Sequence, residues 1–363
     1  MTATGAGSRF AAEIAEQPAV LARLLARERP AVQRIAAAIR RFAPSFILTA
    51  ARGSSDNAAR YAKYLFGAHN QLVVGLGAPS LVTLYGAAPA LGRALVLGIS
   101  QSGESPDIVA LLQEGRRQGA LTVAITNHVG SPLAGAAEHV IDLCAGREEA
   151  VVASKSYTAQ LLALAMLSAA VEDRDDRWPA LAALPSAVAA TIELCGASAG
   201  ALAGTTAGAF TAGGAPVPDR MVVLGRGFNF ATAFEVALKI KETAYLLADP
   251  YATPDFFHGP LALVDAGFPA LIVAPSGATV PDVVPTLDAL AARAARVAVI
   301  SDDPALLQHP AVSLPLPIAA GVPEWLSPVT AVVPGQFLAL ALAQARGHDA
   351  DRPRGLSKIT RTR

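Results

Sequence analysis

Three charged residues in the second half of the chain could carry out proton transfer. Glu235, Lys239 and Glu242 stand at positions i, i+4 and i+7, so a helix over 230–247 would place all three on one face. A carboxylate held beside a lysine in a ligand cleft is suited to act as a general base. The same spacing also occurs in exposed ion pairs, which contribute roughly 0.2–0.5 kcal/mol each. The spacing leaves both interpretations open.

A loop rich in hydroxyl groups follows an apolar run at 94–100, and a helix is expected to begin directly after it. Hydroxyls and the free amides of a helix N-terminus can together bind a phosphate without a lysine. Ser54 and Ser55, in the turn after an earlier apolar run, could converge on the same anion. Serines at such positions also cap helices and form turns. The hydroxyls of the loop belong to Ser100, Ser102 and Ser105.

Three further stretches hold groups that could take part in catalysis. His258 lies between aromatic residues and a Gly-Pro turn, and histidine titrates near neutral pH, although a lone histidine is often structural. The connection 146–156 contains two acids, a lysine and two hydroxyls, a composition that also fits a solvated surface loop. The basic tail at 351–360, which includes Lys358, would by itself be interpreted as a frayed terminus.

Short apolar runs that alternate with helical patterns must position these residues. Such runs, bounded by Gly, Pro or Ser, are typical of strands in parallel sheets built from βα units. In the first half they lie at 46–51, 71–76, 94–100, 121–126 and 139–143. In the second half they lie at 220–225, 268–274, 297–301 and 311–314, and a long helix is expected at 328–346.

The two halves also begin in the same way. In each, an apolar run is followed by Arg-Gly, a short turn and a helical pattern, at Arg52-Gly53 and at Arg226-Gly227. Glycine allows backbone angles that other residues avoid and lets a ligand approach the main chain. An Ala-rich helical stretch at about 178–212 separates the halves. We therefore expect two tandem doubly wound α/β domains, each with its opening loop at the crevice beyond the strand carboxyl ends.

Composition limits the classes of function. The length of 363 residues suggests two domains at roughly 150 residues each. Only 16% of the residues are charged and 53% are hydrophobic, so most of the chain should be buried. Lys plus Arg and Asp plus Glu both total 29, and this zero net charge argues against nucleic acid or an anionic membrane as a partner.

The remaining composition signals concern the compartment. Cys144 and Cys195 lie in apolar stretches without metal or redox spacing, which predicts buried thiols in a reducing environment. The N-terminus has no apolar segment typical of a secretory signal. The longest apolar run, at 159–171, is shorter than the ~18 residues of a membrane span. We expect a cytoplasmic protein with no membrane segment.

Seven motifs in one order resemble those of the sugar isomerase (SIS) family. Within it, the chain resembles the isomerase half of glutamine:fructose-6-phosphate amidotransferase and the standalone glucosamine-6-phosphate deaminases. The motifs lie at 13–18, 99–105, 154–160, 224–227, 235–242, 258–263 and 352–358. The resemblance implies two tandem SIS domains, each a three-layer αβα sandwich. The expected division is a helical segment 1–40, a first domain 41–177, a helical connection 178–215, a second domain 216–346 and an active-site tail 347–363.

The resemblance also implies roles for the matching positions. Glu242 would move a proton between carbons 1 and 2 of the opened sugar, with Lys239 and Glu235 shaping its charge state. His258 would assist ring opening, contributed across the interface of a homodimer. Lys358 would form a Schiff base with the ketose carbonyl. The sugar phosphate would be held by the serine loops, with Ser54 beside Ser55, Ser100, Gln101, Ser102 and Ser105.

Sugar recognition shows one departure from the family pattern. Val151 and Ala153 would contact the sugar, and Ala153 stands where the synthase carries a serine. The chain also begins without a glutaminase part, so it is not expected to draw ammonia from glutamine. Both departures resemble the deaminase branch. No metal and no organic cofactor is expected.

The implied activity is therefore conversion of an amino-sugar phosphate, most readily glucosamine 6-phosphate, to fructose 6-phosphate and ammonia. Two alternatives within the enzyme class are a galactosamine-6-phosphate deaminase and a deglycase acting on fructosamine phosphates. A third alternative is a non-catalytic sugar-phosphate sensor. Such a sensor would keep the serine loop but would not need Glu242, His258 or Lys358.

Overall fold

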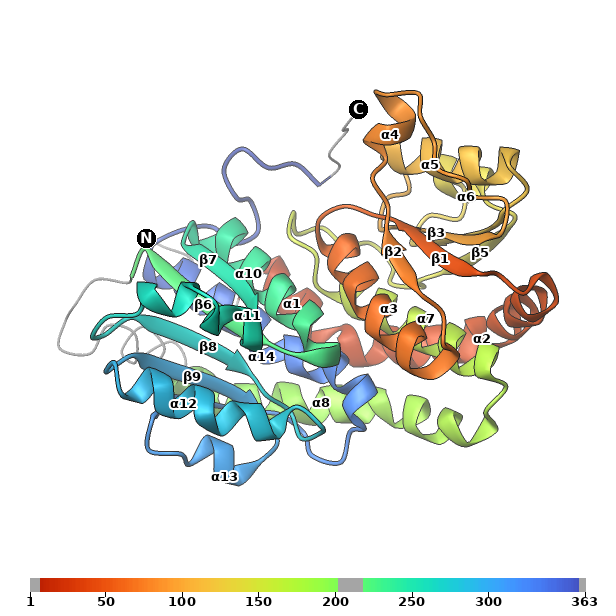
Figure 1. Ribbon diagram of the computed structural model, residues 1–363. Helices are drawn as coiled ribbons and strands as arrows, with labels where there is room; N and C mark the ends of the chain where they lie inside the picture. The colour runs from red at the N-terminus through yellow and green to blue at the C-terminus, as the bar shows by residue number, and fades with distance from the viewer. Residues whose placement is uncertain (1–6, 202–217, 359–363) are drawn as a thin grey trace. The chain divides into compact units, whose positions relative to one another are not determined.

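The computed structural model describes residues 7–201 and 218–358, which form two compact units (Figure 1). The described part of the first, here called the N-terminal unit, is 19–148, 155–183 and 356–358. That of the second, the C-terminal unit, is 7–18, 149–154, 184–201 and 218–355. Each unit contains one sheet of five parallel strands, which confirms the predicted α/β class.

The sheet of the N-terminal unit has the strand order β2-β1-β3-β4-β5. The sequence predicted all five strands, two of them with the observed bounds. These two, β3 and β4, are buried at every residue, because helices cover both faces of a parallel sheet. The strands are β1 (Phe46–Ala50), β2 (Val74–Leu76), β3 (Ala94–Ser100), β4 (Leu121–Thr126) and β5 (His139–Asp142).

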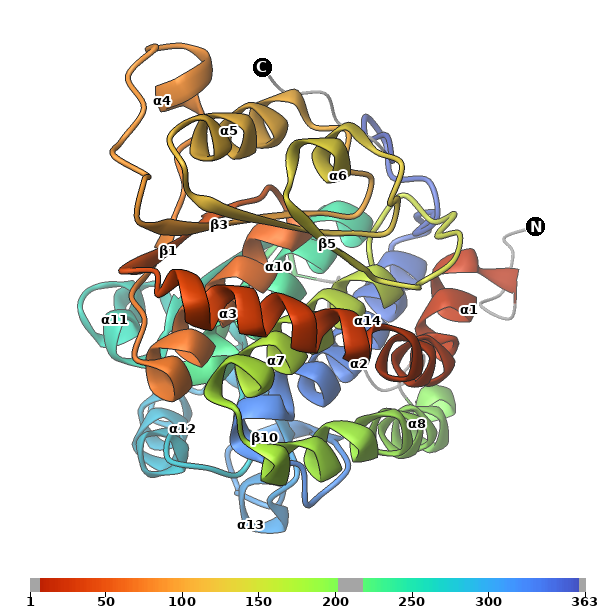
Figure 2. The same cartoon turned by 90° about the vertical axis from the view of Figure 1, so that its right-hand side faces the viewer.

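Figure 2 shows α5 and α6 on one face of this sheet and α3 and α7 on the other. Strand residues Val96 and Ala124 share a buried core with Leu111, Leu112 and Leu133 from the covering helices. The unit is thus a three-layer sandwich, as expected. Its helices are α2 (Gln17–Phe42), α3 (Ser54–Asn70), α4 (Ser80–Thr83), α5 (Pro106–Arg117), α6 (Pro132–Ala136) and α7 (Lys155–Glu172).

The sheet of the C-terminal unit repeats this topology, with the order β10-β9-β8-β6-β7. The two Arg-Gly openings also match in conformation, since Gly53 and Gly227 have φ values of 55° and 59°. The predicted internal repeat is therefore confirmed. The strands are β6 (Arg220–Gly225), β7 (Leu247–Ala252), β8 (Pro269–Val273), β9 (Arg296–Ser301) and β10 (Val312–Pro317).

The helices α12 and α13 cover one face of this second sheet, and α10 and α14 pack together on the other (Figure 1). Val222, Ile272 and Val299 of the strands share a core with Leu287 and Leu290 of α12. The long predicted helix at 328–346 is present as α14. The helices are α1 (Arg9–Ala15), α10 (Phe230–Ala244), α11 (Thr253–Phe257), α12 (Val283–Ala291), α13 (Pro304–Leu307) and α14 (Ser327–Ala345).

Two predictions in this unit were wrong. The helix expected over 230–247 ends at Ala244, where Tyr245 takes the left-handed conformation, and Leu247 already begins β7. The sequence predicts no strand there, because Asp and Pro are rare in strands and occupy positions 249 and 250. The strand is possible because β7 forms the edge of the sheet, where a proline need not donate to a neighbour.

The predicted domain boundaries differ from the division into units. The helical segment expected at 1–40 divides: α1 belongs to the C-terminal unit and nearly all of α2 to the N-terminal unit. In the tail, 347–355 and 356–358 also belong to different units. The helix expected at 178–212 is present as α8 (Trp178–Ala201). Positions 1–6, 202–217 and 359–363 of the predicted segments lie outside the described residues.

Two helical segments, Asp175–Gly196 and Glu324–Ala345, are long and apolar enough to cross a membrane by length and composition. Neither is a nearly uninterrupted apolar run, so the expectation of no membrane segment did not include them. The apolar window of Glu324–Ala345 is 89% buried, as in the core helix of a folded unit, and that of Asp175–Gly196 is 28% buried.

Both cysteines are buried free thiols, as predicted, and burial raises the pKa of Cys144 to about 11 and of Cys195 to about 12.

Candidate active site

The two serine loops of the N-terminal unit meet at the carboxyl ends of β1 and β3. These strands are direct neighbours, paired from Phe46 with Ala94 to Ala50 with Gly98. The chain passes from β1 to β2 on one side and then reaches β3 on the other side. Open α/β sheets bind ligands at this reversal of strand order. The fold therefore places the loops where the sequence analysis expected an anion.

A buried carboxylate joins the two loops. Arg52, in the turn after β1, approaches Asp107 Oδ2 with Nη2 at 2.7 Å and donates to it from Nε at 2.9 Å. Asp107 stands in the first turn of α5, and its side chain is 1% exposed. The pair fixes the start of α3 against the start of α5. The C-terminal unit repeats it, since Arg226 pairs with Asp282 directly before α12.

If the serine loops hold a sugar phosphate, as the family resemblance implies, Asp107→Asn is expected to weaken binding of a hexose 6-phosphate about tenfold, because hydrogen bonds to a charged group contribute about 1.5–3 kcal/mol. Titration calorimetry would measure the affinity. Asp282→Asn is the matched control: it removes the equivalent pair of the second repeat and should change that affinity less than about twofold. Equal losses in the two variants would contradict a role of the first repeat in holding the phosphate.

The turn after β3 has a shape that requires glycine. Gly103 has a φ of +66°, and a side-chain carbon there would lie 2.1 Å from Ser131 Oγ. The Gly103 amide donates to Ser100 Oγ at 3.0 Å, so Ser100 does form the turn. Its hydroxyl accepts this bond and keeps its own proton to donate. The turn-forming role and an anion-binding role are thus compatible.

The other loop hydroxyls differ in their partners. Ser102 Oγ accepts from the Glu104 amide at 3.3 Å, while Ser105 precedes α5 without a capping side-chain bond. Ser105 therefore occupies the N-cap position of α5 without a capping bond from its hydroxyl. Ser55, nearly buried at the start of α3, accepts from Gln160 Nε2 at 3.0 Å. Their predicted contacts with a phosphate stay predictions.

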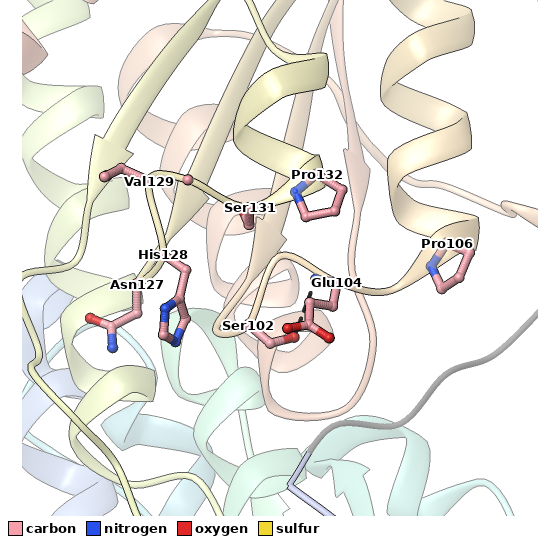
Figure 3. A pocket seen from close by; sticks show the side chains of 9 residues that line it. Ser102, Glu104, Pro106, Asn127, His128, Val129, Ser131 and Pro132 are labelled. Atoms are coloured by element: carbon pink, nitrogen blue, oxygen red, sulfur yellow. Dashed lines mark hydrogen bonds between the residues drawn. The ribbon is translucent and has the colours of Figure 1, made fainter.

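Two cavities open beside the loop, and Ser102 lines both. The first, of about 730 Å³, lies between the loops after β3 and β4, with Glu104, Asn127 and His128 at its wall (Figure 3). The second, of about 610 Å³, contains Gln101, Ser102, Glu148 and Lys358. Both volumes fall within the range of small-molecule sites, about 300–1,000 Å³.

Sequence reasoning missed several cavity residues. Asn127 and His128 directly follow β4, the neighbour of β3, so the rule applied to β1 and β3 would have found them. Asn127 also holds the next loop, accepting from the Ala145 amide at 2.9 Å and donating to Gly146 O at 2.7 Å. Arg23 and Arg27 reach the 610 Å³ cavity from α2, which no motif indicated.

The connection 146–156 is not the solvated loop that its composition also fitted. The side chain of Glu148 is 0% exposed and lies 2.7 Å from Lys358 Nζ. Ser154 and Ser156 are buried as well. The tail is therefore not frayed up to Lys358, which docks on this connection. Val151 and Ala153 are half-buried, and their contact with a sugar stays a prediction.

The acid–lysine cluster of α10 is buried, so the alternative of an exposed helix face is wrong. Glu235 and Lys239 are 0% and 1% exposed, and Glu242 is 23% exposed. Lys239 Nζ lies 3.5 Å from Glu235 Oε1 and 2.5 Å from Glu242 Oε2. One ammonium group thus lies between two carboxylates, of which only Glu242 keeps substantial access to solvent.

His258 lies directly after α11 in the C-terminal unit and is exposed, so it is not a core histidine. Phe257 and Leu263, on either side of it, are 43% and 48% exposed. Among the residues that the structure describes, no three His, Cys, Asp or Glu side chains gather as metal ligands would.

The family can now be stated. The sequence model of the SIS domain matches residues 44–170 and 217–343, one match on each five-stranded sheet. The chain belongs to the SIS family. The two sheets are two SIS domains in tandem, and the serine loop belongs to the first. The acid–lysine cluster and His258 belong to the second.

The SIS relatives with curated names include glutamine–fructose-6-phosphate aminotransferases (isomerizing). That of Pyrococcus horikoshii is 32% identical over 319 residues, covering 86% of this chain and 51% of the relative. That of Synechocystis is 34% identical over 331 residues, covering 84% and 49%. The chain therefore spans about half the length of these relatives.

Solved structures of other proteins have the same fold. A proposed phosphosugar isomerase of Silicibacter pomeroyi is 34% identical, with a TM-score of 0.82, and covers 95% of this chain and 100% of its own. A glucosamine-6-phosphate deaminase of Thermotoga maritima has a TM-score of 0.78 at 21% identity, covering 98% and 100%. The second likeness shows the fold alone.

Proposed function

We propose that the chain is a deaminating aldose–ketose isomerase that converts glucosamine 6-phosphate to fructose 6-phosphate and ammonia. One observation carries the proposal: the Lys358 amine and the polar loop residues Gln101 and Ser102 line one cavity of about 610 Å³. The hydroxyl loop would hold the sugar by its phosphate, away from the reacting carbons. Binding energy at that remote group fixes the orientation of the carbonyl end.

Glu242 is the proposed base. Moving a proton from carbon 2 to carbon 1 of the opened amino aldose, and a second proton from the ammonium group to the oxygen on carbon 1, produces a protonated imine at carbon 2. Water then adds to that imine carbon and ammonia leaves. Lys239, 2.5 Å from Glu242, places a positive charge beside the carboxylate that takes and returns the proton.

The relatives support this choice of substrate. The curated relatives are named as aminotransferases that act on fructose 6-phosphate. Deamination of glucosamine 6-phosphate yields that same sugar phosphate, by removing an amino group instead of adding one. A protein of the same fold is a glucosamine-6-phosphate deaminase.

The decisive experiment measures ammonia release by the purified full chain from a panel of sugar phosphates. Ammonia from glucosamine 6-phosphate is expected, at a higher kcat/KM than from galactosamine 6-phosphate or a fructosamine 6-phosphate. A reversed preference would instead identify one of the two alternative enzymes. Saturable binding of hexose phosphates, without ammonia release from any member of the panel, would contradict the deaminase and support the alternative of a non-catalytic sugar-phosphate sensor.

A homodimer with His258 contributed to the neighbouring site is also part of the proposal. The exposed Phe257 and Leu263 around His258 are apolar side chains that a second copy would cover. Specific activity is expected to fall on dilution, in parallel with dissociation measured by analytical ultracentrifugation. Constant activity in a fully monomeric sample would contradict a shared site.

A further inference from the structure

The last described side chain of the tail ends against a buried acid within the N-terminal unit. Lys358 Nζ lies 2.7 Å from Glu148 Oε2, across 210 positions of sequence. The Glu148 side chain is 0% exposed, whereas that of Lys358 is 24% exposed. The carboxylate is thus enclosed by protein, and the amine lies at the boundary with the cavity that both residues line.

Other bonds hold Glu148 in place independently of the tail. The amide of Ser156 donates to Glu148 Oε1 at 3.0 Å, and its hydroxyl donates to Oε2 at 2.7 Å. Ser156 lies in the first turn of α7, an 18-residue helix whose N-terminus favours a negative charge. The carboxylate therefore has a fixed position against which the end of the chain can dock.

We propose that Glu148 is the residue that positions Lys358 and takes its proton when the lysine amine attacks the sugar. This inference rests on the sugar-phosphate site of the proposed function and on the Schiff base that the family resemblance implies for Lys358. A lysine that carries its proton has no free electron pair, so an ammonium group bonded to Glu148 cannot attack a carbonyl carbon. The carboxylate that docks the tail, 2.7 Å from the amine, is therefore also placed to accept that proton.

With a ketose phosphate, imine formation at Lys358 needs one proton acceptor beside the amine. The Lys358 ammonium gives one proton to Glu148, and the freed amine forms a bond to carbon 2 while the carbon–oxygen π bond breaks. The nitrogen then loses a second proton, which moves to the former carbonyl oxygen. The resulting carbinolamine loses its hydroxyl as water, with Glu148 returning its proton to the leaving oxygen. The products are the imine and one water molecule, and no oxidant or reductant is needed.

Other charged groups border the same cavity and are common to every variant of the test. They are Arg23 and Arg27 of α2, His128 after β4, Asp142 at the end of β5 and Arg147 beside Glu148. Lys155, buried at the start of α7, adjoins Ser156 in sequence. The Glu148 carboxylate lies 2.7 Å from the Lys358 amine, so its removal tests the proton transfer directly.

Borohydride trapping with fructose 6-phosphate measures the imine without turnover, and mass spectrometry locates the adduct on Lys358. At pH 7, Glu148→Gln is expected to trap about 10²-fold more slowly, the lower part of the range for a positioned base. Its rate should rise about tenfold per pH unit from pH 7 to 9, because hydroxide must then remove the proton, while the wild-type rate rises less than threefold. Glu148→Asp should recover most of the rate.

Glu149→Gln is the matched control, since Glu149 is the adjacent acid and pairs with Arg9 at the surface. It should trap at a rate within about twofold of wild type. Ser156→Ala keeps the ion pair and removes one bond to Glu148, so a smaller loss is expected even if Glu148→Gln does not fold. A trapping rate of Glu148→Gln equal to that of Glu149→Gln would overturn the inference. So would a wild-type pH profile of the trapping rate in both Glu148→Gln and Ser156→Ala.

The same assay separates this inference from the proposed function. An adduct on wild-type Lys358 that depends on Glu148, without ammonia release from any hexosamine phosphate, would contradict the proposed deaminase function and support the inference about Glu148. Ammonia release from glucosamine 6-phosphate without any adduct on Lys358 would do the reverse.

Discussion

Glu242→Gln is expected to lower kcat for ammonia release from glucosamine 6-phosphate by about 10²–10⁴-fold, the usual contribution of a positioned base. An amide cannot take the proton from carbon 2, although it fills nearly the same volume. A coupled assay with glutamate dehydrogenase would measure the ammonia. Titration calorimetry should show that affinity for the sugar phosphate changes much less, because the phosphate is assigned to the serine loop of the other SIS domain.

Glu193→Gln, on the exposed face of α8, is the control for the same chemical change and should retain full activity. Activity of Glu242→Gln close to wild type would remove Glu242 from the mechanism. A parallel loss of activity and of thermal stability would show a structural effect instead, so the thermal midpoint is measured for both variants.

Lys239→Met is expected to lower the free energy of unfolding by about 3–5 kcal/mol, because it leaves a buried carboxylate without its cation. Glu235 is 0% exposed and has Lys239 Nζ at 3.5 Å. Methionine matches the length of lysine but brings no charge. Urea unfolding followed by circular dichroism would measure the change, and ammonia release should also fall because Glu242 loses the same ammonium group.

Lys241→Met provides the matched control, since Lys241 is exposed on the same helix and should change stability by less than about 0.5 kcal/mol. The double variant Lys239→Met with Glu235→Gln removes both charges and should regain part of the stability. A single Lys239→Met variant as stable as Lys241→Met would show that the buried pair adds nothing to folding.

Strands with helices on both faces were predictable because burial makes them nearly continuous apolar runs. The predicted bounds of β3, β4 and β6 match those observed. Strand β7 escaped detection because a sheet edge tolerates residues such as Pro250 that argue against a central strand. An apolar run therefore predicts a strand that is buried between helices, but not a strand at the edge of a sheet.

Site residues could be predicted where they lie close to one another in the sequence. The hydroxyl loop around Gly103 is contiguous, and the pair Glu235 and Lys239 shares a helix face. Burial of that pair could not be inferred, since i, i+4 charges more often face solvent. Arg23 and Arg27 reach the cavity from α2 through packing that no local pattern records.

By itself the sequence determined the α/β class, the repeat and the loops at the strand carboxyl ends, because hydrophobic periodicity and glycine-containing turns are local properties of the chain. Only the tertiary structure decided which distant groups share an environment. Asp107 meets Arg52 and Lys358 meets Glu148 because strand order and tail docking bring them together. The energy of such contacts depends on distance and burial, neither of which spacing along the chain can specify.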